Sequence, residues 1–320
     1  MLSEQNKTQY RESGLDNRMQ RTINTSALRG DLREQEPMSR HTSWKTGGVA
    51  DYFYSPADID DLSVFISEVP MEIPIVWVGL GSNLLVRDGG ISGVVISVVG
   101  VLDNLEFING NEISIGAGVS CVKAARFAAK EGYSGIEFLA GIPGSVGGAL
   151  AMNAGAYGGE IWRNIKQVET INRKGVRKIF SKADFEIDYR SVSLPKDEWF
   201  TACDIELKLS EKTAVTRNIK KMLSERAEAQ PLGKLSCGSV FRNPPEDHAA
   251  RLIESCGLKG RYVGDACVSE KHANFIINMG AATSSDIEQL IELIRTTVYE
   301  KHAVKLIPEV RVIGEARGAQ

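Results

Sequence analysis

Gly141-Ile-Pro-Gly-Ser-Val-Gly-Gly-Ala149 is the stretch that restricts the fold of this chain most, with four glycines in nine positions. Glycine has no Cβ, so a backbone rich in it can take positive φ angles or lie against another group. The same character extends over residues 79–159, which hold 18 of the chain's 31 glycines in 81 positions. Val, Ile, Leu and Ala stand between these glycines, unlike in a flexible linker, and no three-residue period indicates collagen. The region is therefore predicted to be a folded core whose backbone turns sharply or approaches a ligand.

The remaining composition is that of an ordinary globular chain of 320 residues, with 42% hydrophobic and 25% charged residues. A net charge of −3 argues against a nucleic-acid partner. The five cysteines have no Cys-x-x-Cys spacing and the four histidines no ligand spacing, so we expect neither a disulfide framework nor a metal site. No apolar run is long enough for a membrane helix, and the polar N-terminus lacks the apolar stretch of a signal peptide. We therefore expect a cytoplasmic protein without membrane insertion.

Changes of composition and pattern divide the chain into four parts. Residues 1–25 are polar and without periodicity, which predicts a mobile extension, with ordered structure from near Met38. Residues 26–98 and 99–211 each mix strands with a helix, and residues 212–320 form a last unit that begins with a helical pattern. This mixed order favours an α+β fold over a regular parallel array.

Local signals place several elements. Asp58 precedes an amphipathic helix, and residues 120–131 read as a second helix that Gly132 ends. Ser285-Asp-Ile-Glu288 matches a capping box and predicts the start of a further helix. Residues 307–313 form an apolar run that predicts a closing strand.

Two glycine-rich loops are candidate anion sites, because converging backbone N–H groups bind phosphate. They are Gly79-Leu-Gly-Ser-Asn83, directly after a predicted strand, and residues 141–149. The chain contains no Gly-x-x-x-x-Gly-Lys-Ser/Thr and no full Gly-x-Gly-x-x-Gly, which argues against a Walker-type NTPase and a Rossmann dinucleotide site. Tight turns alone would explain one such loop, whereas two loops that both carry serine favour phosphate binding.

Seven motifs, in order along the chain, together resemble one family, the UDP-N-acetylenolpyruvoylglucosamine reductases. They are His41-Thr-Ser-Trp-Lys-Thr-Gly-Gly48, Val78-Gly-Leu-Gly-Ser-Asn-Leu-Leu85, residues 141–149, Asn153-Ala-Gly-Ala-Tyr-Gly-Gly-Glu160, Tyr189-Arg190, Gly238-Ser-Val-Phe-Arg-Asn-Pro244 and Ile307-Pro-Glu-Val310. The resemblance covers about residues 38–314. It implies a two-subdomain FAD-binding fold of the vanillyl-alcohol-oxidase (PCMH) type, residues 26–98 and 99–211, followed by a smaller α+β substrate-binding domain, residues 212–320.

The resemblance implies an activity as well. It is the FAD-dependent, NADPH-driven reduction of the enolpyruvyl ether of UDP-N-acetylglucosamine enolpyruvate to UDP-N-acetylmuramate, in peptidoglycan precursor synthesis. FAD would be held tightly and without a covalent link, and the partners would be small molecules only, with the protein a monomer. The implied FAD contacts are Gly79, Gly81, Ser82, Asn83, Leu84, Gly141, Ile142, Pro143, Gly144, Ser145, Gly147, Gly148, Ala149, Asn153, Gly155, Ala156 and Arg226.

By the same resemblance Arg190, Ser239 and Glu309 are catalytic, and these three contact the substrate together with Gln230 and Asn243. Reducing an enolpyruvyl double bond needs a hydride at one carbon and a proton at the next. Ser239 would donate the proton, which requires close placement and exclusion of water. Arg190 would bind the substrate carboxylate, and a protonated Glu309 would donate a hydrogen bond to the enolate. Without the resemblance, Ser239 also fits a serine in a turn, Arg190 an arginine in a surface ion pair, and Glu309 an outward-facing residue of a strand.

Spacing refines the resemblance. The gaps of 49 residues from Arg190 to Ser239 and 70 from Ser239 to Glu309 look too short for the subclass with an inserted tyrosine loop, so the chain resembles the compact subclass and no tyrosine lid is expected. Two alternatives stay open. One is another flavin oxidase or dehydrogenase of this fold acting on a sugar, lactone or alcohol, and the other is a flavin-free protein that only binds a nucleotide sugar.

Overall fold

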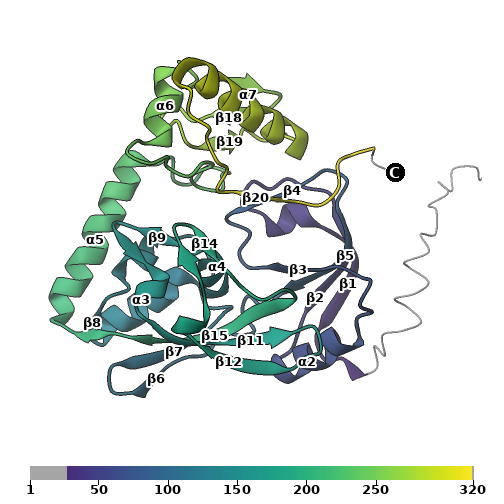
Figure 1. Ribbon diagram of the computed structural model, residues 1–320, viewed down its shortest axis with the longest axis vertical. Coiled ribbons are helices and arrows are strands. Elements are labelled where there is room, and N and C mark those ends of the chain that lie inside the picture. Colours follow the sequence, from purple (N-terminus) through teal and green to yellow (C-terminus); the bar gives the residue numbers. More distant parts are fainter. Residues whose placement is uncertain (1–26, 319–320) are drawn as a thin grey trace, which may run out of the picture.

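The structure is a computed structural model that describes residues 27–318, and the predicted extension, residues 1–25, lies outside the described residues. Figure 1 shows three units, with the last one, around α6 and α7, lying above the other two. Regular structure begins with β1 (Asp31–Pro37), so the expectation that it starts near Met38 is wrong by one strand. β1 is an edge strand with mostly exposed side chains, and its polar sequence therefore shows no apolar alternation.

The first unit is a four-stranded sheet in the order β1-β2-β5-β3. β1 pairs antiparallel with β2 (Val49–Ser55), and β5 (Ile91–Ser97) and β3 (Ile75–Val78) continue the sheet in parallel. α2 (Ile59–Glu68) packs its apolar side on this sheet. It begins where the sequence predicts, because the Asp58 carboxylate accepts hydrogen bonds from the N–H groups of Asp60 and Asp61. β3 ends immediately before the first glycine loop.

A buried carboxylate fixes α2 to β2. Asp61, only 2% exposed, accepts hydrogen bonds from the Tyr54 hydroxyl at 2.5 Å and from the backbone N–H groups of Ala57 and Arg29, both at 2.8 Å. Burial acts to raise the pKa of Asp61, but the hydrogen bonds from these donors together have a larger effect in the opposite direction. The pKa of Asp61 therefore lies below its ordinary value. The ionised carboxylate therefore stabilises the fold above the pKa of the unfolded chain, and this stability is lost as pH falls through the folded pKa.

We expect Asp61→Asn to lower the free energy of unfolding by about 3 kcal/mol at pH 7, because an amide cannot accept from all three donors. Urea titrations at pH 7 and at lower pH values measure the effect. The wild-type protein should lose part of its stability advantage over the variant as the pH falls below 3.8, the ordinary pKa of an aspartate side chain. A difference that does not depend on pH would contradict the assignment of an ionised Asp61.

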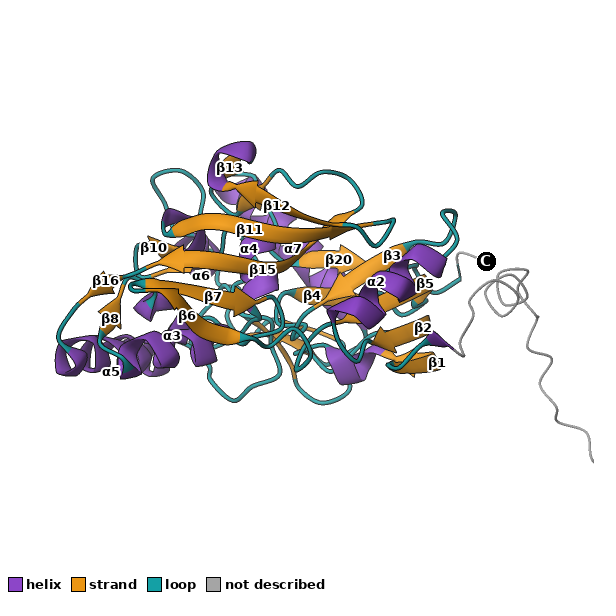
Figure 2. Cartoon of the chain, turned by 90° about the horizontal axis from the view of Figure 1, so that it is seen from below, coloured by secondary structure: helices purple, strands orange, loops and turns teal. Residues whose placement is uncertain are grey.

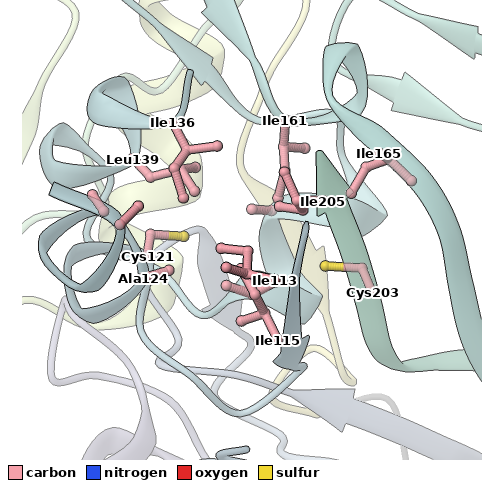
Figure 3. Packing of buried hydrophobic residues seen from close by; sticks show 14 of the residues in the cluster. Ile113, Ile115, Cys121, Ala124, Ile136, Leu139, Ile161, Ile165, Cys203 and Ile205 are labelled. Atoms are coloured by element: carbon pink, nitrogen blue, oxygen red, sulfur yellow. The ribbon is translucent and has the colours of Figure 1, made fainter. Parts of the chain in front are cut away.

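The second unit is a five-stranded antiparallel sheet in the order β12-β11-β15-β7-β6. Its strands are β6 (Leu105–Asn109), β7 (Glu112–Gly116), β11 (Ile165–Asn172), β12 (Arg177–Ser181) and β15 (Glu198–Glu206). The helical segments are α3 (Cys121–Lys130), η3 (Glu137–Gly141) and α4 (Val146–Ala151). Figure 3 shows Ile113 and Ile115 of β7 and Ile205 and Cys203 of β15 facing Cys121 and Leu139 across the core. This packing fixes the backbone at both ends of the second glycine loop.

α5 (Lys212–Ala229) runs along one edge of the molecule from β8 toward α6 (Figure 1). The sequence division places it at the head of the last unit. In the structure its buried residues Val215 and Ile219 join the core of the second unit, beside α3 and η3. The C-terminal end of α5 then leads to the residues that connect the two units.

The third unit packs α6 (Ala249–Ser255) and α7 (Ser284–His302) with the antiparallel strands β17 (Tyr262–Val263), β18 (Ala266–Val268) and β19 (Ile276–Asn278). Two residues of the first unit enter this core. Trp44 is fully buried there and donates to the Ile276 carbonyl at 2.8 Å, and Leu85 packs beside it. The last strand, β20 (Arg311–Ile313), leaves the unit and pairs in parallel with β4 (Leu84–Val86). The first and third units are thus joined both by side chains and by backbone.

Two local predictions need correction here. The capping box of α7 is made by Thr283 and Asp286, two residues before the predicted pair Ser285 and Glu288. The closing strand covers only Arg311–Ile313, because residues 307–309 pair instead with the segment around Phe241. The remaining short elements are η2 (Met38–His41), β8 (Tyr133–Ser134), β9 (Gly155–Ala156), β10 (Gly159–Glu160), η4 (Ile161–Arg163), η5 (Lys182–Asp184), β13 (Ile187–Asp188), β14 (Ser191–Val192) and β16 (Lys208–Leu209).

Figure 2 gives a view from below, in which β11, β15 and β7 of the second unit run across the molecule beside the first-unit strands. Within residues 27–318, none of the helices combines the length and the apolar character that crossing a bilayer requires.

Candidate functional site

The two glycine loops meet in the structure. A Cβ added to Gly79 would lie 2.3 Å from Ser145 Oγ, and one added to Gly144 would lie 3.4 Å from Ser82 Oγ. The first loop follows β3 of the first unit; of the second, residues 141–145 lead into α4 of the second unit and residues 146–149 form the start of that helix. Glycine at position 79 therefore allows the two units to approach each other at this point.

Backbone donors are left free where the loops meet. The N–H groups of residues 80–83 and 144–145 donate to no other group within residues 27–318. One carbonyl of each loop is held by another segment: Gly81 accepts from Ser43 N–H at 3.0 Å and Gly144 from Cys121 N–H at 2.9 Å. Loops held by their carbonyls, with their N–H groups unused, form the kind of concave backbone site that binds phosphate oxygens.

A cavity of about 540 Å³ opens beside this junction. Its lining includes Gly79 and Pro143 and four cations, Arg40, Lys45, Arg226 and Lys234, and among the described residues no Asp or Glu takes part. A site with this charge and with free N–H groups fits the pyrophosphate of a dinucleotide cofactor such as FAD. Sequence reasoning missed Arg40, Lys45 and Lys234. The sequence does contain a signal for two of them, because Arg40 directly precedes the motif that begins at His41 and Lys45 lies within it.

A second cavity, of about 360 Å³, adjoins the first at Arg226, which lines both. Its walls include Gly141, Gly155, Ala156 and Gln230 of the predicted set. Arg226 Nε donates to Gln230 Oε1 at 2.9 Å, and burial lowers the pKa of Arg226 below its ordinary value. The Tyr157 hydroxyl donates to the Met222 carbonyl of α5 at 2.7 Å and ties the hairpin of β9 and β10 to this helix.

Several predicted cofactor residues have packing roles in the structure. Ser145 is 3% exposed and accepts from Gly148 N–H at the start of α4. A Cβ on Gly147 would lie 2.8 Å from the Ala117 side chain, and Ala149 is buried in the second core. Leu84 pairs with β20 as part of β4. These residues hold the loop through packing and strand contacts.

Arg190 is held in a defined position by the loop that follows α4. Its Nη2 donates to the Gly155 carbonyl at 2.6 Å and its Nη1 to the Asn153 carbonyl at 3.3 Å. Arg190 and Asn153 both have positive φ, 55° and 45°, which costs free energy for a residue with a Cβ. The Asn153 side chain is 1% exposed, and its Oδ1 has no hydrogen-bond partner in the described chain. Strain together with an unsatisfied buried oxygen indicates a binding site.

Glu309 lies against Arg190, with its Oε1 3.3 Å from Arg190 Nε and with both side chains only about one-sixth exposed, 16% and 15%. Two backbone contacts fix its place: its N–H donates to the Val240 carbonyl at 2.7 Å, and its carbonyl accepts from Asn83 Nδ2 at 3.1 Å. Burial raises the pKa of Glu309 above its ordinary value, although the neighbouring Arg190 and Arg242 guanidinium groups counteract part of this. A carboxyl with a raised pKa can hold a proton at a pH where an exposed glutamate is ionised.

Ser239 lies between the cavity and this pair. Gly238 lines the larger cavity, and Val240 is the residue whose carbonyl holds Glu309. No hydrogen bond of the Ser239 hydroxyl occurs among the described residues, so the hydroxyl is available to a ligand. Asn243 is exposed, and its Oδ1 accepts from Ala249 N–H at 3.1 Å at the start of α6. The structure thus brings Arg190, Glu309 and the Ser239 segment together and gives Asn243 a contact within the fold.

Comparison with known proteins finds two domain families in this chain. Residues 50–180 match the model of an FAD binding domain, and residues 230–313 match the model described as UDP-N-acetylenolpyruvoylglucosamine reductase, C-terminal domain. The enzyme of that name from Alkalilimnicola ehrlichii is 52% identical over 90% of this chain and 96% of its own length, and that from Legionella pneumophila is 51% identical over 90% and 94%.

A solved structure extends the comparison. The crystal structure of UDP-N-acetylenolpyruvylglucosamine reductase from Thermus caldophilus superposes with a TM-score of 0.76 at 32% identity, covering 89% of this chain and 99% of the other. α5 falls between the two matched regions, residues 50–180 and 230–313. Identity above 50% over nine-tenths of the chain, with the same three-unit fold, shows that the chain belongs to the UDP-N-acetylenolpyruvoylglucosamine reductase family.

Proposed function

We propose that this protein reduces the enolpyruvyl ether of UDP-N-acetylglucosamine enolpyruvate to UDP-N-acetylmuramate, with FAD as cofactor and NADPH as reductant, in peptidoglycan precursor synthesis. The observation that carries the proposal is the pairing of Arg190 with a largely buried Glu309, held by the segment of Ser239 next to a cationic cavity with free backbone donors. Family membership and the match to an FAD binding domain support the same reaction.

The cofactor is proposed to lie along the larger cavity. The N–H groups of residues 80–83 and 144–145 would hold its pyrophosphate, with Arg226 and the other cavity cations balancing the charge. Bound FAD supplies the hydride. NADPH is proposed to use the same site in turn with the enolpyruvyl substrate, because no nicotinamide fingerprint is present in the sequence.

The other roles in the reaction are proposed for side chains of the protein. Arg190, fixed by the carbonyls of Asn153 and Gly155, would bind the substrate carboxylate, where negative charge builds up during the reaction. Ser239 would deliver the proton to the carbon next to the one that accepts hydride. Glu309, when protonated, would donate a hydrogen bond to the enolate oxygen. Gln230 and Asn243 are proposed substrate contacts, through the amide atoms that their contacts within the fold leave free.

The purified protein tests the proposal directly. It should be yellow, and denaturation should release the flavin, as expected for non-covalent binding. Under anaerobic conditions NADPH should bleach the flavin, and UDP-N-acetylglucosamine enolpyruvate should restore its colour. A colourless protein that FAD cannot reconstitute would contradict the proposal, and reoxidation by oxygen but not by this substrate would favour an oxidase of the same fold.

The proposal also covers the roles of the units, the oligomeric state and the location of the protein. Residues 26–98 and 99–211 are proposed to bind FAD and residues 212–320 the substrate, with α5 as the packed connection. The protein is proposed to act as a monomer in the cytoplasm. Size-exclusion chromatography with light scattering should give the mass of one 320-residue chain.

A further inference from the structure

Arg242 is a second guanidinium beside Glu309, and the predicted catalytic set contains no role for it. Its segment pairs antiparallel with the segment of Glu309 around the bridge from Phe241 to Pro308. Arg242 N–H donates to the Ile307 carbonyl at 2.9 Å, and Glu309 N–H donates to the Val240 carbonyl at 2.7 Å. In this register Arg242 and Glu309 are diagonal neighbours on one face of the ladder, within reach for long side chains.

Arg242 also contacts the segment that carries Arg190. Its Nη2 donates to the Arg190 backbone carbonyl at 3.0 Å, and Arg190 itself has a positive φ of 55°. The two arginines are therefore linked, one through its guanidinium and the other through its backbone, and both lie next to Glu309.

The cluster of Arg190, Arg242 and Glu309 has hydrogen-bonding capacity and positive charge that are not matched within the described residues. Arg242 Nε is buried and makes no hydrogen bond within the described residues, whereas the buried Arg190 Nε lies 3.3 Å from Glu309 Oε1 but makes no hydrogen bond of good geometry. Two guanidinium groups and one carboxylate leave at least one positive charge without a counterion. The free N–H donor of Arg242, the neighbouring N–H of Arg190 and one excess positive charge match the two oxygens and the single negative charge of a carboxylate.

We propose that Arg242 is a second ligand for the substrate carboxylate and acts together with Arg190. The proposal rests on the proposed function. It assigns Arg242 to the carboxylate of the enolpyruvyl group and not to the diphosphate of the UDP moiety, because Glu309 and Ser239, the groups proposed to act on the enolate, lie in the same two segments.

The charged groups acting on Glu309 in the described chain are Arg190 and Arg242, and both lower its pKa against the effect of burial. Removing the charge of Arg242 should therefore raise the pKa of Glu309. The protonated form would then persist to higher pH, and the limb of the pH–rate profile that belongs to Glu309 should move to higher pH. A residue with a purely structural role would not move this limb.

The test compares Arg242→Met and Arg242→Lys with Arg126→Met, a matched removal of an exposed arginine on α3. In Arg242→Met we expect the KM for the enolpyruvyl substrate to rise roughly 10- to 100-fold, since a charged hydrogen-bonded contact is lost. Inhibition by UDP-N-acetylglucosamine, which lacks the carboxylate, should be unchanged. Arg242→Lys keeps the charge, so it should retain the wild-type pH limb while its KM rises several-fold, and Arg126→Met should behave as wild type.

Each result supports or overturns the assignment. An unchanged KM in Arg242→Met, or equal weakening of the substrate and of UDP-N-acetylglucosamine, would overturn it. If Arg242→Met does not retain flavin, Arg242→Lys decides, and an unchanged KM in that variant overturns the proposal. If the enolpyruvyl substrate does not reoxidise the flavin of the wild-type protein, both the proposed function and the role of Arg242 are contradicted. If the wild-type protein turns over normally and Arg242→Met is unaffected, only the role of Arg242 is contradicted.

Discussion

Ser239→Ala is expected to slow reoxidation of the reduced flavin by UDP-N-acetylglucosamine enolpyruvate by roughly 10²- to 10⁴-fold, the usual contribution of a general acid. Reduction of the flavin by NADPH should stay close to the wild-type rate, because hydride transfer from NADPH needs no proton from this hydroxyl. The hydroxyl has no hydrogen bond within the described chain, and the change therefore removes no contact that holds the fold. Anaerobic stopped-flow absorbance measures the two half-reactions separately.

Two further serine variants sharpen this experiment. Ser239→Cys keeps a group that can donate a proton, so its reoxidation rate should lie between those of wild type and Ser239→Ala. Ser67→Ala removes an exposed hydroxyl whose only hydrogen bond within the described residues is to the Val64 carbonyl of α2, and both half-reactions should be unaffected. Equal loss of both half-reactions in Ser239→Ala would count against Ser239 as the proton donor and favour a role in shaping the cavity.

Local sequence signals predicted local structure well. Asp58 begins α2 and Ser120 begins α3, as expected, because each side chain accepts hydrogen bonds from N–H groups only two or three residues away. The strand predicted directly before the first glycine loop is likewise present, as β3. Such elements depend on neighbours in the sequence, and the sequence contains the whole of that information.

The errors occur where a distant segment decides between two local options. Thr283 with Asp286 and Ser285 with Glu288 match the capping pattern equally well. The structure uses the first pair, because Asp88 of the first unit accepts from the N–H groups of Ser284 and Ser285. Glu288 instead pairs with Arg87 at 3.0 Å. One contact from another unit thus sets the start of α7, and no local pattern contains it.

The candidate site shows the same limit. Its glycine loops are visible in the sequence because glycine is required locally, but their meeting at Gly79 and Ser145 depends on the packing of two units. The approach of Glu309 to Arg190 joins residues 119 positions apart through the ladder of residues 240–242 and 307–309. The excess charge at Arg242 appears only once that ladder is in place. Resemblance to a family could point to Arg190 and Glu309, but it could not give the distance between them or the burial that raises the pKa of Glu309.

Gly81→Ala should abolish tight flavin binding. Gly81 has a φ of +62°, and an added Cβ would lie 1.9 Å from the His41 backbone carbonyl oxygen, which cannot rotate away as a side chain can. The loop would have to leave residues 41–43, break the hydrogen bond from Ser43 N–H to the Gly81 carbonyl, and carry the free N–H groups of residues 80–83 with it. Losing two such donors to a phosphate costs about 3 kcal/mol or more, which is at least a hundredfold in the FAD dissociation constant.

Gly110→Ala is the matched control, because Gly110 has a similar φ of +56° but no atom within 4 Å of an added Cβ. Both variants force an alanine into the left-handed region, at a cost of roughly 1–2 kcal/mol, and only Gly81→Ala adds the clash at the loop. Circular dichroism and flavin titration of the apoproteins separate folding from binding. If Gly81→Ala does not fold, Gly79→Ala tests the same junction, and Ser145→Ala in the same chain should partly restore binding by removing the Oγ that the new methyl would meet. Equal FAD affinities of Gly81→Ala and Gly110→Ala would mean that the cofactor does not depend on this loop. Weaker binding confined to Gly81→Ala would show that the glycine is needed for the position of the backbone donors and not only for its left-handed conformation.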